Sequence, residues 1–218
     1  MKKKIIIFGA GGHAGVVTSE IKKMNKYEVE GYFVKNIQDK NINKNLRKKV
    51  LEFDLNKINK LLKKNFSLFV AIGDNLLRKE IVDEINNYKP NVIWENIISI
   101  DSTVDPTVKF GFGNLIMPGC IINAFTEIKN HCLINTGAVI EHENFLNNYS
   151  SVGPRAVTAG KVNIGQLSHI GMGSSVLEDI KIGKNVIIGA NSLVSKNIET
   201  EGTYYGSPAK FVRNNCDR

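Results

Sequence analysis

The chain has 218 residues, 42% of them hydrophobic and 23% charged, which suits one large packed domain or two small ones. Its 29 basic and 21 acidic residues give a formal net charge of +8, but the lysines are scattered among asparagines and isoleucines. No basic block interleaved with aromatic residues stands out, which argues against nucleic-acid binding. The positive surplus instead suits an anionic small molecule, such as a nucleotide or a phosphate-bearing coenzyme.

The opening MKKKIIIFGAGGHAGVV imitates a signal peptide only superficially. Four glycines and His13 break its apolar run, and no small-x-small cleavage site closes it. No apolar run approaches the roughly 18 residues of a membrane span, so none is expected. The three cysteines (Cys120, Cys132 and Cys216) are odd in number and lack metal-site spacing. We interpret them as reduced thiols of a cytoplasmic protein.

Residues 1–92 are predicted to form a Rossmann-like α/β domain. Strand and helix patterns alternate along this region, which is typical of a small parallel sheet covered by helices. Asp74 or Asn75 is available to cap the last helix. The predicted elements are a strand, glycine loop and helix over 2–24, a strand over 27–34, a helix over 51–65, a strand over 66–74 and a helix over 75–88.

The glycine loop of this region fits a phosphate-binding pattern. Gly9, Gly11 and Ala14 match G-x-G-x-x-G/A, in which glycine lets the backbone approach a phosphate at a helix N-terminus. A tight turn in any α/β domain would look the same. A dinucleotide site would also need an acidic residue near the end of the second strand, where Val34 and Lys35 stand. NAD binding is therefore disfavoured.

Residues 93–218 repeat with a period of six and are predicted to form a left-handed parallel β-helix, an all-β fold, followed by a C-terminal tail. Every sixth residue from Ile98 to Val194 is apolar at sixteen of seventeen positions, Thr158 being the exception. Three short strands would make one coil of about 18 residues, so residues 18 apart would stack. Small residues stand two positions before the repeat at 120, 126, 132, 138, 150, 156, 168, 174 and 192.

The segment AVIEHENFL places a histidine between two glutamates within this array. His142 lies two residues beyond the repeat position Ile140, so its side chain belongs outside the coil. Glu143 can hold one ring nitrogen and raise the basicity of the other. One coil later stands Gly160, whose amide could stabilise an oxyanion. A solvated turn residue is the alternative interpretation of His142, but the three groups together suit acyl transfer to an amine or hydroxyl.

Metal chemistry is the competing use of histidines in such a solenoid. A zinc site of the carbonic-anhydrase kind needs three converging imidazoles. His131, His142 and His169 are separated by 11 and 27 residues, and neither gap is a multiple of 18. They should not stack within one chain, so we expect no metal, although convergence across a subunit boundary stays open. His131 and His169 could equally be surface residues.

Five segments together resemble a known family: IIIFGAGGHAGVV, FVAIGDNLLRKEI, LINTGAVIEHENF, TAGKVNIG and YYGSPAKFV. Over essentially its whole length the chain resembles the bacterial sialic-acid O-acetyltransferases and the related N-acetyltransferases of nucleotide-linked 4-amino-sugars (NeuD/PglD-like). The resemblance implies N-acetylation of a nucleotide-linked amino-sugar in surface glycan biosynthesis, with acetyl-CoA as co-substrate. It also implies a homotrimer with active sites between neighbouring solenoids.

The resemblance further implies roles for particular residues. His142 would be the general base and Glu143 would raise its basicity. Gly11, Gly12 and His13 would hold the nucleotide-sugar or sugar, and Gly206–Lys210 would lie near the distal end of the coenzyme. Acetyl-CoA would run along the solenoid near Ser151, Gly160, Met172 and Ala190.

Two departures from the family pattern leave alternatives open. Many relatives carry two aspartates after the second strand, where this chain reads YFVKN, which leaves room for a nucleotide other than uridine or for a free sugar. Relatives also often carry a histidine where this chain has Ser151. O-acetylation of sialic acid or a related sugar is one alternative function. A non-catalytic, trimeric nucleotide-binding scaffold is another.

Overall fold

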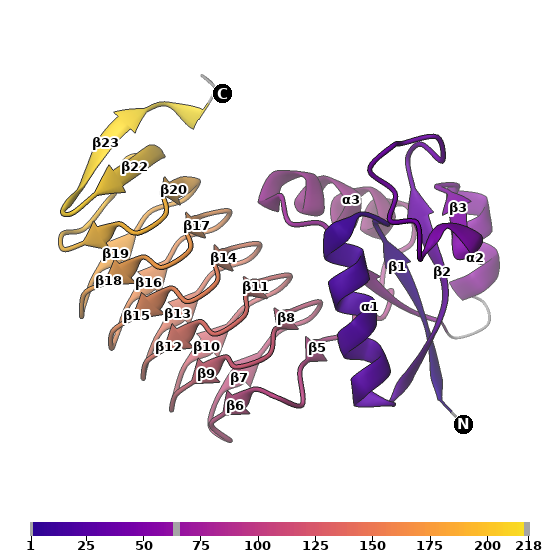
Figure 1. The fold of residues 1–218 in the computed structure, drawn as a ribbon, viewed down its shortest axis with the longest axis horizontal. Helices are drawn as coiled ribbons and strands as arrows, with labels where there is room; N and C mark the ends of the chain where they lie inside the picture. The colour runs from indigo at the N-terminus through magenta and orange to yellow at the C-terminus, as the bar shows by residue number, and fades with distance from the viewer. Residues whose placement is uncertain (1, 63–65, 216–218) are drawn as a thin grey trace. The chain divides into compact units, whose positions relative to one another are not determined.

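The computed structural model describes residues 2–62 and 66–215, and the chain divides into two compact units, Met1–Ile100 and Asp101–Arg218 (Figure 1). Cys216 lies outside the described residues. In the described part of the chain, no helix is both long and apolar enough to cross a membrane.

The first unit is built on a four-stranded parallel sheet in the order β3-β2-β1-β4. The central strand β1 is fully buried from Ile5 to Phe8, as expected for a parallel strand that is covered on both faces. This confirms the predicted Rossmann-like region. The elements are β1 (Lys3–Phe8), α1 (Gly12–Met24), β2 (Tyr27–Val34), η1 (Arg47–Lys49), β3 (Val50–Glu52), α2 (Leu55–Leu62), β4 (Ser67–Val70), α3 (Asn75–Tyr88) and β5 (Ile97–Ile98).

The helix predicted over 51–65 is wrong in its first part. Val50–Glu52 instead forms the edge strand β3, with Val50 opposite Tyr32 of β2. Asp54 then starts the helix, because its side chain accepts a hydrogen bond from the Asn56 amide at 2.8 Å. The last predicted residues, 63–65, lie outside the described residues. By contrast, α3 begins where expected, with the Asp74 carboxylate accepting from the Leu77 amide at 2.9 Å.

The second unit is a left-handed parallel β-helix with three sheets along its length (Figure 1). From β6 to β21, strand partners are 18 residues apart: Ser151 pairs with Leu133 in the preceding coil and with His169 in the next. The first sheet contains β6 (Thr103–Val104), β9 (Ile121–Ile122), β12 (Val139–Ile140), β15 (Val157–Thr158), β18 (Ser175–Val176) and β21 (Leu193–Val194). The second contains β7 (Lys109–Phe110), β10 (Glu127–Ile128), β13 (Phe145–Leu146), β16 (Asn163–Ile164) and β19 (Lys181–Ile182). The third includes β8 (Leu115–Ile116), β11 (Leu133–Ile134), β14 (Ser151–Val152), β17 (His169–Ile170), β20 (Val186–Ile188), β22 (Gly202–Gly206) and β23 (Ala209–Arg213).

The repeat residues fill the interior of the coil. From Ile116 to Val194 every sixth residue is at most 2% exposed, including Thr158. The first three members of the predicted series, Ile98, Val104 and Phe110, are only partly buried. The array therefore has a complete core from Ile116 onward, while its first turn is less enclosed.

The small residues that precede the repeat positions tie successive coils together. Several donate a hydrogen bond from the side chain to the carbonyl 15 residues later, in the next coil. Thr126 Oγ1 reaches Glu141 O at 3.0 Å, and Ser174 Oγ reaches Gly189 O at 2.8 Å. A small polar side chain at this place fits inside the corner and also satisfies a buried carbonyl. We call these positions the corner positions.

Candidate active site

The turn after β12 presents His142 and Glu143 to solvent. Both side chains are about half exposed, and His142 Nδ1 lies 3.1 Å from Glu143 Oε2. Glu143 has a left-handed backbone with φ of 57°. When Nδ1–H donates to the carboxylate, the ring is held in the tautomer that leaves a lone pair on Nε2. The pair therefore has the geometry of a base and its orienting group.

Gly160 lies directly beside the imidazole, one coil further along. A Cβ placed on Gly160 would come within 2.5 Å of His142 Cε1 and 2.6 Å of Nε2. The neighbouring ladder bonds run from the Lys161 amide to His142 O at 2.9 Å and from the Ala159 amide to Val176 O at 2.9 Å. Within the described residues, no backbone acceptor is recorded for the Gly160 amide. Because Gly160 has no side chain, the His142 imidazole can lie against its backbone.

Apart from Gly160, the residues proposed for acetyl-CoA lie on the third sheet or in the turns that follow its strands β17 and β20. Ser151 is buried, and its Oγ lies 2.8 Å from Nδ1 of His169 in the next coil. Met172 is exposed, and the coil containing Ala190 stacks on it, with the Asn191 amide donating to Met172 O at 2.8 Å. The segment Gly206–Lys210 contains the turn of the hairpin between β22 and β23 and the strand residues next to it.

The expectation that His131 could be a surface residue is wrong. His131 is 4% exposed and its ring stacks on Tyr149, with centroids 5.3 Å apart and an interplanar angle of 6°. Gly113 leaves the room that this ring needs, since a Cβ there would clash with it. Among the described residues, no group of three or more His, Cys, Asp or Glu side chains could hold a metal ion.

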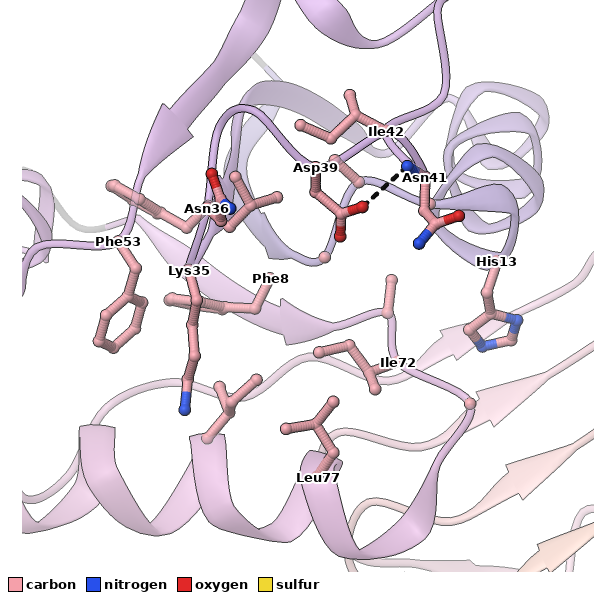
Figure 2. A pocket seen from close by; sticks show the side chains of 18 of the residues that line it. Phe8, His13, Lys35, Asn36, Asp39, Asn41, Ile42, Phe53, Ile72 and Leu77 are labelled. Atoms are coloured by element: carbon pink, nitrogen blue, oxygen red, sulfur yellow. Dashed lines mark hydrogen bonds between the residues drawn. The ribbon is translucent and has the colours of Figure 1, made fainter.

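The first unit has a pocket of about 400 Å³ at the carboxyl ends of its strands. Gly11, Gly12 and His13 line it, as do Lys35 and Phe53. In Figure 2 the Lys35 side chain lies in the same part of the pocket as Phe53, whereas His13 lies at the opposite end. Gly9 opens the loop with φ of 101°, and a Cβ there would clash with Ala71 O. The loop and its helix N-terminus therefore form one wall of a preformed site.

Two comparisons identify the family. Residues 4–85 match the model described as the PglD N-terminal domain, and residues 161–196 match the bacterial transferase hexapeptide model of six repeats. A crystal structure of a histidine-to-asparagine mutant of perosamine N-acetyltransferase from Caulobacter crescentus, in complex with CoA and GDP-perosamine, is 30% identical with a TM-score of 0.87. The match covers 97% of each chain. The chain belongs to the PglD-like acetyltransferases.

Other relatives match either the whole chain or only part of it. The acetyltransferase domain of PglB from Neisseria gonorrhoeae, in complex with acetyl coenzyme A, is 26% identical with a TM-score of 0.87 over 97% of this chain and 100% of that one. The mitochondrial gamma carbonic anhydrase 2 of Arabidopsis thaliana is 24% identical over 67% of this chain and 58% of its own length. Bifunctional protein GlmU of Clostridium botulinum is 27% identical in a match that covers 67% of this chain and 33% of that relative.

Several residues of this PglD-like chain that surround the two sites were not predicted. The segment 36–42 adds Asn36, Asp39 and Asn41 to the pocket wall. The backbone N–H of Asn41 donates a hydrogen bond to Asp39 Oδ1 at 2.8 Å (Figure 2). Its run of Asn and Asp was a signal for such turns. His169 was considered only as a metal ligand or a surface residue, although it pairs with Ser151 of the preceding coil. Asn144, at a corner position, was also missed.

The loop after β4 is held by a fully buried arginine. Arg78 Nη1 donates to Ile72 O at 2.9 Å and to Gly73 O at 3.2 Å, and Nη2 donates to Asn75 Oδ1 at 2.7 Å. Ile72 and Gly73 line the pocket. The guanidinium therefore holds in place the backbone of Ile72 and Gly73, which forms part of the pocket wall.

Arg78→Met should lower the free energy of unfolding of the first unit by about 3 kcal/mol, because it leaves buried carbonyls without donors. Trp94, the one tryptophan of the sequence, reports on this unit in urea titrations followed by fluorescence. Lys79→Met is the control, since its ion pair with Asp83 is solvent-exposed and should contribute less than about 1 kcal/mol. Equal destabilisation by the two substitutions would contradict the role given to Arg78.

Burial lowers the pKa of His13, and the positive charge of Arg78 lowers it further. The unfolded chain therefore takes up a proton at His13 at a higher pH than the folded chain does, so stability should fall as pH drops through about 6.5. Urea midpoints monitored by Trp94 at pH 7.5 and 5.5 measure this loss. His13→Asn should reduce the difference between the two midpoints, and an unchanged difference would contradict the assignment.

Proposed function

We propose that this chain is an acetyl-CoA-dependent N-acetyltransferase that acts on a nucleotide-linked amino-sugar. The observation that carries the proposal is the placement of His142, held by Glu143, against the bare backbone of Gly160. The family supports acetyl transfer, and the Caulobacter relative was crystallised with CoA and GDP-perosamine. We further propose a cytoplasmic reaction, which the buried free thiols of Cys120 and Cys132 support.

In this proposal His142 Nε2 removes a proton from the sugar amine while the amine nitrogen attacks the carbonyl carbon of the thioester. Glu143 stabilises the imidazolium through Nδ1–H. The Gly160 N–H stabilises the oxyanion of the tetrahedral intermediate. When the carbon–sulfur bond breaks, the proton on His142 passes to the departing CoA thiolate, and the products are an amide and free CoA.

The pocket of the first unit would hold the nucleotide of the acceptor. The amides of Gly12 and His13 stand at the N-terminus of α1, and the first turn of this helix has no acidic residue. A helix N-terminus of this kind favours a phosphate group. Phe53 and Lys35 supply an apolar surface and a hydrogen-bond donor at the other end of the pocket. Lys35 would suit a base or sugar that offers acceptor atoms.

We also propose a homotrimer in which the sheet of β6 to β21 forms the subunit contact. Its outward column contains Ile121 and Val157, which are 40% and 38% exposed, together with the half-buried Val139 and Leu193. A stack of aliphatic residues on a flat face is typical of an interaction surface. The turn with His142 follows Ile140 of the same sheet, so a neighbouring solenoid would complete the acetyl-CoA site. Light scattering after gel filtration measures the assembly.

The test of the activity is a screen of guanosine-, uridine-, thymidine- and cytidine-linked amino-sugars with acetyl-CoA, in which the free CoA thiol is measured. One amino-sugar nucleotide should release thiol well above the rate of acetyl-CoA hydrolysis, and its hydroxy-sugar counterpart should not. Turnover with hydroxyl acceptors alone would replace N-acetylation by O-acetylation. Failure with every acceptor would reject the proposed function.

A further inference from the structure

Asn144 carries a buried side-chain amide that contacts the turn of residues 141–143, which contains His142 and Glu143 and which we call the base turn. It occupies a corner position two residues before Leu146, and it is 1% exposed. At comparable corners, Thr126, Ser168 and Ser174 each use a hydroxyl to reach a carbonyl in the next coil. Asparagine is larger than these residues and brings an NH₂ group with two donor hydrogens.

The Asn144 amide reaches both sides of the candidate active site. Its Nδ2 lies 2.7 Å from Glu141 O and 3.2 Å from His142 O, which belong to the base turn. The same atom lies 2.8 Å from Ala159 O in the next coil. The Glu141 carbonyl also accepts a hydrogen bond from the hydroxyl of Thr126 at 3.0 Å.

The contact with Ala159 O bears directly on the Gly160 amide. The carbonyl of Ala159 and the N–H of Gly160 belong to one planar peptide group and point in opposite directions. A donor that fixes the carbonyl therefore fixes the direction of the N–H. Asn144 also contacts the backbone on which the His142 side chain is carried, so one amide ties the base turn to the peptide that bears the oxyanion donor.

We infer that Asn144 is a positioning residue, which holds the His142 turn and the Gly160 N–H in the mutual geometry that acetyl transfer requires. The inference rests on the proposed function for its catalytic consequence. The positioning role also explains why an unfavourable feature is present here: Asn144 Oδ1 is buried without a hydrogen-bond partner. An alanine, serine or threonine at this corner would avoid burying that oxygen, but it could not supply both donor hydrogens.

The test compares Asn144→Ala and Asn144→Ser with Asn114→Ala. Asn114 is the matched control because it is also fully buried two residues before an interior isoleucine, and it accepts from the Cys132 amide at 2.7 Å, away from the base turn. We expect Asn144→Ala to lower kcat about 10- to 100-fold, as misplaced catalytic groups do. KM for the nucleotide-sugar should change by less than about twofold, since an interaction that acts in the transition state affects kcat. Asn144→Ser should recover part of kcat, because its hydroxyl can reach Ala159 O.

Two readouts separate this inference from a purely structural role and from the proposed function. The Gly160 amide resonance in a ¹H–¹⁵N spectrum should shift in Asn144→Ala and shift less in Asn144→Ser, whether or not an acceptor is known. A kcat for Asn144→Ala equal to that of Asn114→Ala would overturn the inference, and so would an unmoved Gly160 resonance. Failure of the wild-type protein with every acceptor would reject the proposed function alone, and the resonance would still test the positioning.

Discussion

His142→Ala is expected to lower kcat for acetyl transfer about 10²- to 10⁴-fold, the range associated with the loss of a general base. The imidazole is half exposed, so its removal should leave the free energy of unfolding nearly unchanged. Initial rates of CoA thiol release at saturating acetyl-CoA measure the effect. Retention of wild-type turnover by His142→Ala would remove the base from the mechanism.

Glu143→Gln should cause a smaller loss, because the amide can still contact Nδ1 but does not stabilise the imidazolium as a carboxylate does. Glu127→Gln is the matched control: Glu127 is a similarly exposed carboxylate on the solenoid, paired with Lys129. If both glutamine variants lost the same fraction of kcat, the decrease would reflect general surface charge and would not depend on the His142–Glu143 pair.

Gly160→Ala should lower kcat about 10- to 100-fold, because the added methyl group displaces the side chain of His142. The new methyl group would lie within 2.6 Å of two ring atoms of His142, so the ring must move away from its present position. Because the imidazole is at the half-exposed end of a side chain, that movement should cost little stability. Kinetics with the preferred acceptor, together with thermal melts, separate the two effects.

Gly119→Ala provides the opposite pattern as a control. Gly119 has φ of 71° and its nearest neighbour to an added Cβ is 3.7 Å away, so the substitution strains the backbone without a clash. It should lower stability by about 1–2 kcal/mol and leave kcat unchanged. If Gly160→Ala behaved like Gly119→Ala, with lost stability and normal kcat, the contact between Gly160 and the imidazole would have no catalytic role.

The period of six was sufficient to predict the β-helix. A repeat that alternates one large aliphatic residue with a small corner residue can bury its apolar side chains in few other ways. The same spacing placed Gly160 one coil from His142, and the structure has them side by side. The Rossmann-like region followed from alternating strand and helix patterns, although β3 was taken for helix because Asp54 was not recognised as the helix start.

Contacts across coils were beyond the sequence. The burial of His131 depends on the room that Gly113 leaves and on the ring of Tyr149, which stacks 18 residues away. Ser151 stays a predicted contact of the coenzyme, but the sequence did not show that its hydroxyl lies 2.8 Å from Nδ1 of His169. Each of these outcomes depends on the direction of a side chain and on its neighbour in the adjacent coil, which periodicity does not encode.

The sequence by itself determined that the second unit winds in coils of 18 residues and that His142 faces outward, because repeated burial of one residue in six leaves few other arrangements. Only the tertiary structure decided what each outward or corner side chain touches. The reason is physical: a hydrogen bond depends on distance and direction to a fraction of an ångström. At Asn144, that geometry joins two coils through one buried amide.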